Sequence, residues 1–214
     1  MADFKAIAEN IISGQAPAVK TGVQKALDEG VPVQDILHKG LIAGMNVVGA
    51  KFKNNEFYIP EVLIAARAMK AGLEMIRPKL LAEKVQPLGK VSIGTVKGDL
   101  HDIGKNLVGM MLEGAGFEVV DLGVDVSPEA FVNSVRQQGV QIVCMSALLT
   151  TTMPSIQTTI DSLKAAGLTQ QVRVMVGGAP ITQDYADKVG AHGYAPDAAT
   201  AAEKARELIA QLKN

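Results

Sequence analysis

A histidine and two aspartates lie between glycines in the segment GTVKGDLHDIGKN, residues 94–106. The segment begins inside an apolar run, KVSIGTV, of the kind that forms a buried strand. An imidazole here can serve as a general base or as a metal ligand, with a nearby carboxylate to fix its tautomer. Aspartate is also a favoured capping residue of helices. The residues therefore leave open whether His101 is a base or a ligand, and whether Asp99 or Asp102 only caps a helix that begins near Ile103.

Two common nucleotide sites are disfavoured by the spacing of this segment. A phosphate-binding loop has four residues between its glycines, followed by lysine and then serine or threonine. Here five residues separate Gly98 from Gly104, and Lys105 is followed by Asn106. No GxGxxG pattern follows the apolar run either, which weighs against a dinucleotide site.

The second part of the chain, residues 90–214, alternates β-rich and helical runs. The β-rich runs are KVSIGTV, FEVVDLG, VQIVCMSAL, VRVMVGG and HGYA. Near-continuous apolar strands separated by helices predict a parallel sheet that is covered on both faces. We therefore expect a doubly wound, flavodoxin-like domain with five parallel strands, and the order 2-1-3-4-5 is assumed in locating its ligand groove.

The first part, residues 1–84, has a helical period instead. Apolar residues recur three and four positions apart, which predicts helices that each bury one stripe, and glycines and prolines separate them. We expect a four-helix bundle formed by residues 3–14, 16–30, 33–52 and 59–80. The stretch LAEKVQPLG, residues 81–89, is the expected linker between the bundle and the α/β domain.

Composition narrows the class of protein. Lysine and arginine number 21 against 22 acidic residues, so the chain has no overall field that would attract nucleic acid or an anionic membrane. The start MADFKAIAENI lacks the profile of a signal peptide, and no apolar run approaches the length of a membrane span. We expect a cytoplasmic protein with neither nucleic acid nor membrane as a partner. The single cysteine, Cys144, is expected to be an inert strand residue.

In a sheet of the assumed order, ligands bind beyond the carboxyl ends of the strands, near the point where the strand order reverses. The first strand leads into the histidine loop, the third ends at Ser146-Ala147-Leu148, and the fourth ends at Gly177-Gly178. These three strands are neighbours in the order 2-1-3-4-5, so their loops border one groove. Small residues let a ligand approach the backbone closely. We expect a deep, narrow groove that suits a long, thin group.

Taken together, these residues resemble the cobalamin-binding signature DxHxxG, SxL, GG of methionine synthase and the corrinoid methyltransferase proteins. The three elements are separated by 41 and 28 residues, and comprise Asp99, His101, Gly104, Ser146, Leu148, Gly177 and Gly178. The N-terminal helices resemble the helical cap domain of the same family. The resemblance covers nearly the whole chain.

The resemblance implies that cobalamin binds with its lower base displaced and its nucleotide tail in the groove. His101 would coordinate cobalt from below, Asp99 would fix the imidazole, and Thr152 would bond that aspartate. Imidazole suits cobalt, and a ligating histidine usually donates its other N–H to a carboxylate. The other two histidines, His38 and His192, match no ligand position.

The remaining implied contacts with the cofactor lie at the other strand ends and in the cap. Ser146 would bond the displaced base, Gly104 would let the corrin pass close, and the tail would run past the others, namely Leu148, Thr150, Gly177 and Gly178. In the cap, Phe52 and Ile59 fall at the positions of two apolar residues that cover the upper face of the corrin in the family, although the second is leucine in methionine synthase. Such a lid must move, so residues 81–89 are the expected hinge.

The implied function is that of a corrinoid protein that shuttles a methyl group. Its partners would be a substrate:corrinoid methyltransferase, a second methyltransferase to tetrahydrofolate or a thiol, and, as a further candidate, a reductive activase. His101, Asp99 and Thr152 would carry ligand exchange and the linked proton. Two alternatives remain at this point: the cobalamin subunit of an adenosylcobalamin-dependent mutase, and a cobalamin sensor. A flavodoxin-like domain without cofactor is a more distant one.

Overall fold

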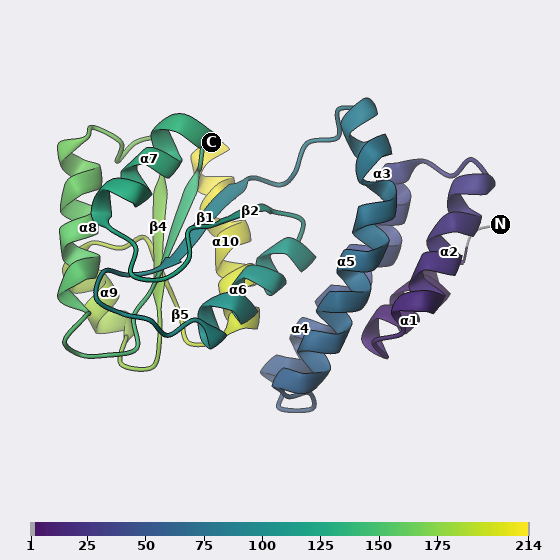
Figure 1. The fold of residues 1–214 in the computed structure, drawn as a ribbon, viewed down its shortest axis with the longest axis horizontal. Helices are drawn as coiled ribbons and strands as arrows, with labels where there is room; N and C mark the ends of the chain where they lie inside the picture. Colours follow the sequence, from purple (N-terminus) through teal and green to yellow (C-terminus); the bar gives the residue numbers. More distant parts are fainter. Residues whose placement is uncertain (1–2, 214) are drawn as a thin grey trace. The chain divides into compact units, whose positions relative to one another are not determined.

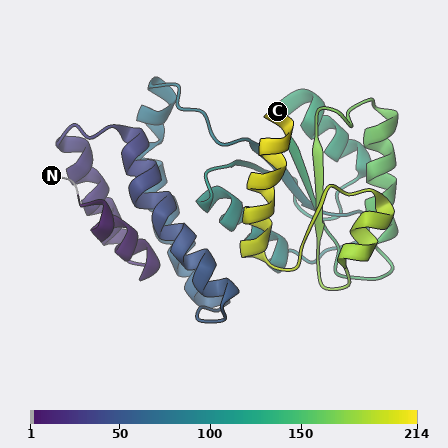
Figure 2. The ribbon, with the colours of Figure 1, turned by 180° about the vertical axis from the view of Figure 1, so that it is seen from behind.

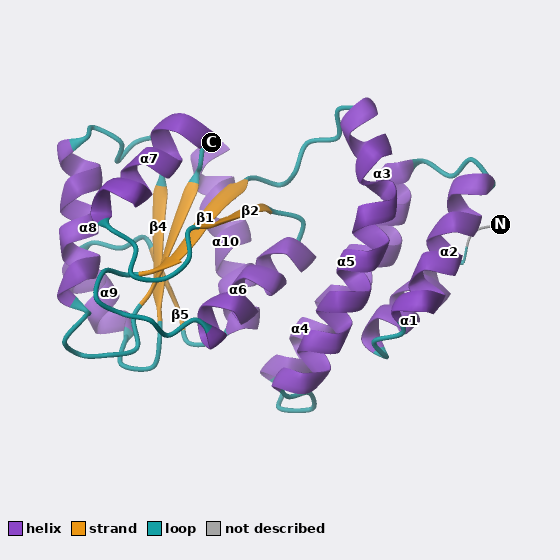
Figure 3. Cartoon of the chain, viewed as in Figure 1, coloured by secondary structure: helices purple, strands orange, loops and turns teal. Residues whose placement is uncertain are grey.

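The structure is a computed structural model that describes residues 3–213 (Figure 1). It divides into two compact units. The first runs to Gln86 and includes Gly114–Gly116, and the second comprises Pro87–Glu113 and the residues from Phe117 onward. The strands all belong to the second unit, as the colouring by secondary structure makes plain (Figure 3). Each unit is described by itself.

The first unit is helical, as its apolar period predicts. Its elements are α1 (Phe4–Ile12), α2 (Ala16–Asp28), α3 (Val33–Asp35), η1 (Ile36–Ile42), α4 (Ala43–Lys53) and α5 (Ile59–Ala82). Local signals set several of the helix starts. The Asp3 carboxylate accepts the Ala6 N–H at 2.9 Å at the start of α1, and the Glu61 carboxylate accepts the Tyr58 N–H at 2.9 Å at the start of α5.

The core of this unit is formed by the apolar stripes of the helices, and glycines let the helices approach closely. A Cβ on Gly44 of α4 would lie 3.0 Å from the Ala8 carbonyl oxygen, and one on Gly72 of α5 would lie 2.7 Å from the Leu41 side chain. Larger residues at these points would force α1, η1 and α5 apart. Close packing of these helices therefore depends on glycines that lie within the helices themselves.

Residues 33–52, predicted as a single helix, contain a π-helical segment that the period did not reveal. In η1 (Ile36–Ile42) the turn is wider than in an α-helix. Ile36 and Leu41 lie five residues apart and are both fully buried. The wider turn therefore places on one face two residues that a regular α-helix would rotate away from each other.

The second unit is a doubly wound α/β fold. Its elements are β1 (Lys90–Thr95), α6 (Ile103–Gly114), β2 (Glu118–Asp121), α7 (Pro128–Gln138), β3 (Ile142–Ser146), α8 (Pro154–Ala165), β4 (Arg173–Gly177), α9 (Gln183–Val189), β5 (Gly193–Ala195) and α10 (Ala198–Lys213). Within the described residues the five strands are parallel and lie in the order β2-β1-β3-β4-β5. The prediction of the parallel sheet is confirmed, and its strands lie in the order that was assumed in locating the groove.

Helices cover both faces of this sheet. α7, α8 and α9 lie on one face and α6 and α10 on the other, in the front and the back view (Figures 1 and 2). The core under α7 and α8 is built from branched and aromatic side chains, among them Phe131, Val143, Ile156 and Val174. The register aligns Thr95, Ser146 and Gly177 across β1, β3 and β4. The loops that follow these three residues therefore start side by side.

Two further predictions concern the single cysteine and the absence of a membrane span. Cys144 is buried in β3, and burial raises the pKa of its thiol, as expected of an inert strand residue. Within residues 3–213, no helix combines the length and the apolar character needed to cross a membrane.

Candidate functional site

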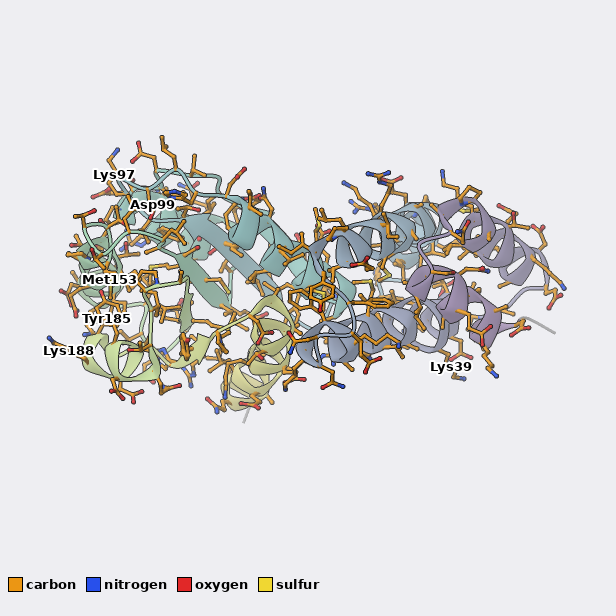
Figure 4. All side chains as sticks on the ribbon, turned by 90° about the horizontal axis from the view of Figure 1, so that it is seen from below. Lys39, Lys97, Asp99, Met153, Tyr185 and Lys188 are labelled. Atoms are coloured by element: carbon orange, nitrogen blue, oxygen red, sulfur yellow. The ribbon has the colours of Figure 1, made fainter. Side chains whose placement is uncertain are left out.

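The histidine loop connects β1 to α6 at the carboxyl edge of the sheet. Its last residues are tied back to the strand, because the buried Thr95 hydroxyl donates a hydrogen bond to the His101 carbonyl at 2.7 Å. Lys97 and Asp99 lie near each other in this loop (Figure 4). The left-handed φ of +85° at Gly98 provides the turn between them.

Asp99 is the centre of the hydrogen-bond network in this loop, and its side chain is fully buried. Its Oδ1 accepts hydrogen bonds from the His101 backbone N–H at 3.1 Å and meets the His101 ring at Nδ1 at 2.6 Å. Its Oδ2 accepts from the backbone N–H groups of Leu148 at 2.8 Å and Leu149 at 3.3 Å, and lies 2.8 Å from the Thr152 hydroxyl. Both oxygens are thereby engaged, so Asp99 does not cap α6.

The charge state of Asp99 follows from these contacts. Burial by itself would raise the pKa of the carboxyl group. The hydrogen bonds from the Leu148 N–H, the His101 ring, the Thr152 hydroxyl and the His101 N–H outweigh it and hold the pKa of Asp99 well below its usual range. The group is therefore a carboxylate at neutral pH, and the proton in the 2.6 Å contact belongs to His101 Nδ1.

His101 is thus held in one tautomer. With the proton on Nδ1, the other ring nitrogen, Nε2, carries a lone pair. The side chain is 51% exposed, and the described residues provide Nε2 with no hydrogen-bond partner. A fixed, half-exposed imidazole with a free Nε2 can act as a metal ligand or as a base. The carboxylate holds the ring in the arrangement that orients ligating histidines, and the same arrangement also orients general bases.

Thr152 contributes to this network through one hydroxyl proton that has two acceptors, Asp99 Oδ2 at 2.8 Å and the Leu149 carbonyl at 2.9 Å. We expect Thr152→Val to lower the free energy of unfolding by about 1–2 kcal/mol, because a buried carboxylate loses a donor. Thr152→Ser keeps the hydroxyl and should lose less. Urea denaturation of the cofactor-free protein measures both; a loss in Thr152→Ser as large as that in Thr152→Val would show that the hydroxyl contributes no more than the methyl group.

The other strand ends carry the remaining residues of the predicted groove. Ser146 is half-buried and Thr150 is exposed, and neither side chain has a hydrogen-bond partner in the described chain. Leu148 belongs to the network through its backbone, and its side chain is partly exposed. A Cβ on Gly178 would lie 1.9 Å from the Ala147 carbonyl oxygen, and φ there is +123°. The fold itself therefore requires glycine at 178, whatever the ligand.

Gly104 differs from Gly178, because a Cβ at Gly104 would meet nothing within 4 Å. Nearby in the chain, the side chains of Leu100 and Ile103 are 71% and 72% exposed. Exposed apolar side chains on both sides of a half-exposed imidazole suit the face of a large, flat, partly apolar ligand. The motif-based prediction missed Leu100 and Ile103. Both are large apolar residues in a loop bounded by glycines, and this could have indicated that they face a ligand.

The ammonium group of Lys105 is not available to bind a ligand. Its ammonium group is buried and lies 2.6 Å from each carboxylate oxygen of Asp121 at the end of β2. This ion pair ties the first turn of α6 to the sheet. Although Lys105 directly follows a glycine, as the lysine of a phosphate-binding loop does, its role here is structural.

The cap residues belong to the first unit. Phe52 is half-buried near the end of α4, and Ile59 begins α5 with 42% of its surface exposed. Lys51, directly before Phe52, donates to the Glu56 carboxylate at 2.8 Å and lies over the Phe57 ring at 5.3 Å. These contacts fix the connection that presents Phe52 and Ile59.

Comparison with known proteins identifies both units. Two family models match, each described as a B12 binding domain, one over residues 4–77 and the other over residues 89–203. Dimethylamine corrinoid protein 3 of Methanosarcina acetivorans is 44% identical over 203 residues, which is 95% of each chain. Trimethylamine corrinoid protein 2 of Methanosarcina mazei is 48% identical over 192 residues, which is 89% of this chain and 85% of the relative.

Solved structures agree with these relatives. The methanol:cobalamin methyltransferase complex of Methanosarcina barkeri contains a chain with a TM-score of 0.87 and 32% identity, over 97% of this chain and 79% of that one. A cobalamin-binding protein of Desulfitobacterium hafniense has a TM-score of 0.81 and 32% identity, over 97% and 99%. The chain therefore belongs to the family of cobalamin-binding corrinoid proteins that take part in methyl transfer, and its helical and α/β parts each match a B12-binding domain.

Proposed function

We propose that this protein carries a methyl group from a methylamine donor between two methyltransferases, with His101 as the lower ligand of cobalt. The relatives named for dimethylamine and trimethylamine support the donor class. The contact of 2.6 Å between His101 Nδ1 and the Asp99 carboxylate is the observation that carries the ligand assignment. It leaves the lone pair of Nε2 available, which is what coordination requires.

The residues around His101 fit a corrinoid. The open space at Gly104 and the exposed side chains of Leu100 and Ile103 suit a flat macrocycle, and the free hydroxyl of Ser146 suits a displaced base. We assign the tail to the strand ends beyond them, at Leu148, Thr150, Gly177 and Gly178. When bound, the corrinoid supplies the cobalt atom that accepts and releases the methyl group.

The protein's own part is to hold and release a ligand and a proton. His101 would hold the cobalt of a bound corrinoid through Nε2 and would release it when the methyl group leaves, while Asp99 keeps hold of Nδ1. The withdrawn imidazole can take a proton, and the Asp99 carboxylate beside it stabilises the resulting cation. Thr152 holds that carboxylate in place.

The helical part serves as a cover in this proposal. Residues 1–84 form the cap and residues 90–214 hold the cofactor. Phe52 and Ile59 shield the methyl group from water. Because α5 runs to Ala82, the hinge expected at residues 81–89 is placed in the connection of residues 83–89 between α5 and β1. The lid has to open for each partner enzyme.

The partners are two methyltransferases, one specific for the donor and one that passes the group to tetrahydrofolate or a thiol, with a reductive activase to restore the cofactor. The solved methanol:cobalamin methyltransferase complex is a precedent for the first. The donor test is methylation of the reconstituted protein by the methyltransferases for dimethylamine, trimethylamine and methanol, each with its donor, followed by absorption spectroscopy. We expect methylation with a methylamine enzyme. Cobalamin binding without methylation by any of the three would contradict the carrier proposal.

The role of Gly104 can be tested separately from chemistry. We expect Gly104→Ala to keep or raise the stability of the cofactor-free protein by up to about 1 kcal/mol, because alanine is the better helix former. The same change should weaken cobalamin binding, since the new Cβ fills space next to the ligand. Gly109→Ala is the matched control, because it lies in the same helix and its Cβ would make only ordinary contacts at 3.9 and 4.0 Å. Equal affinities in a cobalamin titration of the two variants would refute the contact at Gly104.

A further inference from the structure

The histidine loop is held from a second direction, by the connection between β2 and α7. Three consecutive residues of the loop have their backbone tethered. The Ser155 hydroxyl donates to the Lys97 carbonyl at 3.0 Å. The Gly98 N–H donates to Asp125 Oδ1 at 2.8 Å, and the Asp125 N–H donates to the Asp99 carbonyl at 2.9 Å. Asp125 therefore provides two of the three tethers.

Asp125 adopts an unusual conformation in order to do so. Its φ is +52°, and the described residues contain only two other non-glycine residues with positive φ, Asn55 and Lys84. Left-handed backbone is costly for most residues, although aspartate tolerates it better than most. In this conformation both the N–H and the carboxylate of Asp125 meet the same loop. Backbone outliers of this kind cluster at functional sites.

The two directions of support meet at Asp99. Its carboxylate is held by the residues that follow β3, and its carbonyl is held by Asp125. His101 lies two residues further on and bonds the same carboxylate. The position of the imidazole therefore depends on both clamps, and the loss of either would let the loop shift.

The Gly98 contact is the stronger part of the Asp125 clamp. The Gly98 N–H, and secondarily the Lys97 ammonium at 3.0 Å, lower the pKa of Asp125, so the acceptor is charged at neutral pH. Hydrogen bonds to a charged acceptor are stronger than neutral ones. The ion pair with Lys97 is exposed at the surface and contributes little.

We propose that Asp125 is a positioning residue for His101, which acts by clamping Gly98 and Asp99 from the β2–α7 connection. This inference rests on the proposed role of His101 as cobalt ligand. Asp125 itself does not touch the imidazole in this arrangement. It fixes the backbone from which the imidazole projects.

The test uses three variants of the full chain. Asp125→Ala removes the carboxylate and puts a residue with poorer tolerance of positive φ at this point. Asp125→Asn keeps a side-chain oxygen for the Gly98 N–H and tolerates the conformation. Ser127→Ala is the matched control, because Ser127 ends the same connection and its hydroxyl accepts a backbone N–H, that of Ala130 in the first turn of α7, rather than one of the histidine loop.

The first readout is amide hydrogen exchange of the cofactor-free protein. In Asp125→Ala, the amides of Gly98 and His101 should exchange at least roughly tenfold faster than in the wild type, because a charge-assisted hydrogen bond is lost. In Asp125→Asn and Ser127→Ala they should stay close to the wild-type rates. Unchanged protection in Asp125→Ala, or an equal loss in Ser127→Ala, would overturn the clamp.

The second readout is electron paramagnetic resonance of the cobalt(II) protein with nitrogen-15 in its histidines. Asp125→Ala should show a smaller fraction of cobalt coupled to the label, and Asp125→Asn should restore the wild-type fraction. Full coupling in Asp125→Ala, or failure of Asp125→Asn to restore it, would overturn the positioning role. No coupling in the wild type would instead refute the ligand assignment, and hydrogen exchange would still report on the clamp.

Discussion

Replacing His101 with alanine should lower the rate of methyl transfer at least about 100-fold, because loss of a group that merely supports a metal ligand already costs 10–100-fold. The ring is half-exposed and its contacts run to Asp99, so the variant should fold. Cobalamin should still bind, since the assigned tail residues at the ends of β3 and β4 are unchanged. The variant should lose the imidazole ligand of cobalt, and the absorption spectrum of the methylated protein should change as a result.

The matched control for this variant is His38→Ala, which removes an exposed histidine from η1. It should retain the wild-type spectrum, the wild-type rate and the nitrogen-15 coupling of the cobalt(II) form. An unchanged spectrum in His101→Ala would remove the ligand assignment. Loss of coupling in His38→Ala would instead identify His38, in the helical unit, as the cobalt ligand.

The second large effect is expected from Asp99→Asn, which replaces one carboxylate oxygen by an NH2 group. Oδ2 faces three donors, the N–H groups of Leu148 and Leu149 and the Thr152 hydroxyl. The amide oxygen should therefore take that place, which turns the NH2 group toward His101. Nδ1 would then have to accept a hydrogen bond, and the ring proton would move to Nε2. A protonated Nε2 cannot coordinate cobalt.

We therefore expect Asp99→Asn to lower methyl transfer roughly 10- to 100-fold through the wrong tautomer, with little change in cobalamin affinity. The tautomer can be observed directly from the nitrogen chemical shifts of His101 in the cofactor-free protein. Asp102→Asn is the matched control, since Asp102 lies in the same loop and its carboxylate only accepts the Asn106 side-chain amide at 3.1 Å. Wild-type tautomer and wild-type activity in Asp99→Asn would contradict this mechanism.

The type of fold could be predicted because it depends on residue type and period. Five apolar runs separated by helical ones predict a covered parallel sheet. The order of its strands was an assumption, and it agrees with the order in the structure. The same reasoning predicted the helices of the first part. It missed the π-helical segment η1. The packing of this segment against α1 and α5, with Ile7 against Gly40 and Leu41 against Gly72, does not appear in the local period.

The candidate site was predictable where it depends on side chains with distinctive chemistry. His101 and Asp99 could be singled out by their types and spacing, whereas Thr152 was named only through the resemblance to cobalamin-binding proteins. The signature glycines were also visible, but their reasons were not. The structure gives Gly178 a role in the approach of two loops, whereas Gly104 is left facing open space.

What the sequence by itself determined is therefore the set of chemical groups, the strand that carries each of them and the class of cofactor that they suit. The tertiary structure decided how these groups are held. The Leu148 N–H donates to a carboxylate 49 residues away, Thr152 reaches it across 53 residues, and Asp125 clamps the same loop from another connection. Backbone amides are common to almost every residue, so their partners follow only from the register of β1 against β3 and from the loops that this register brings together.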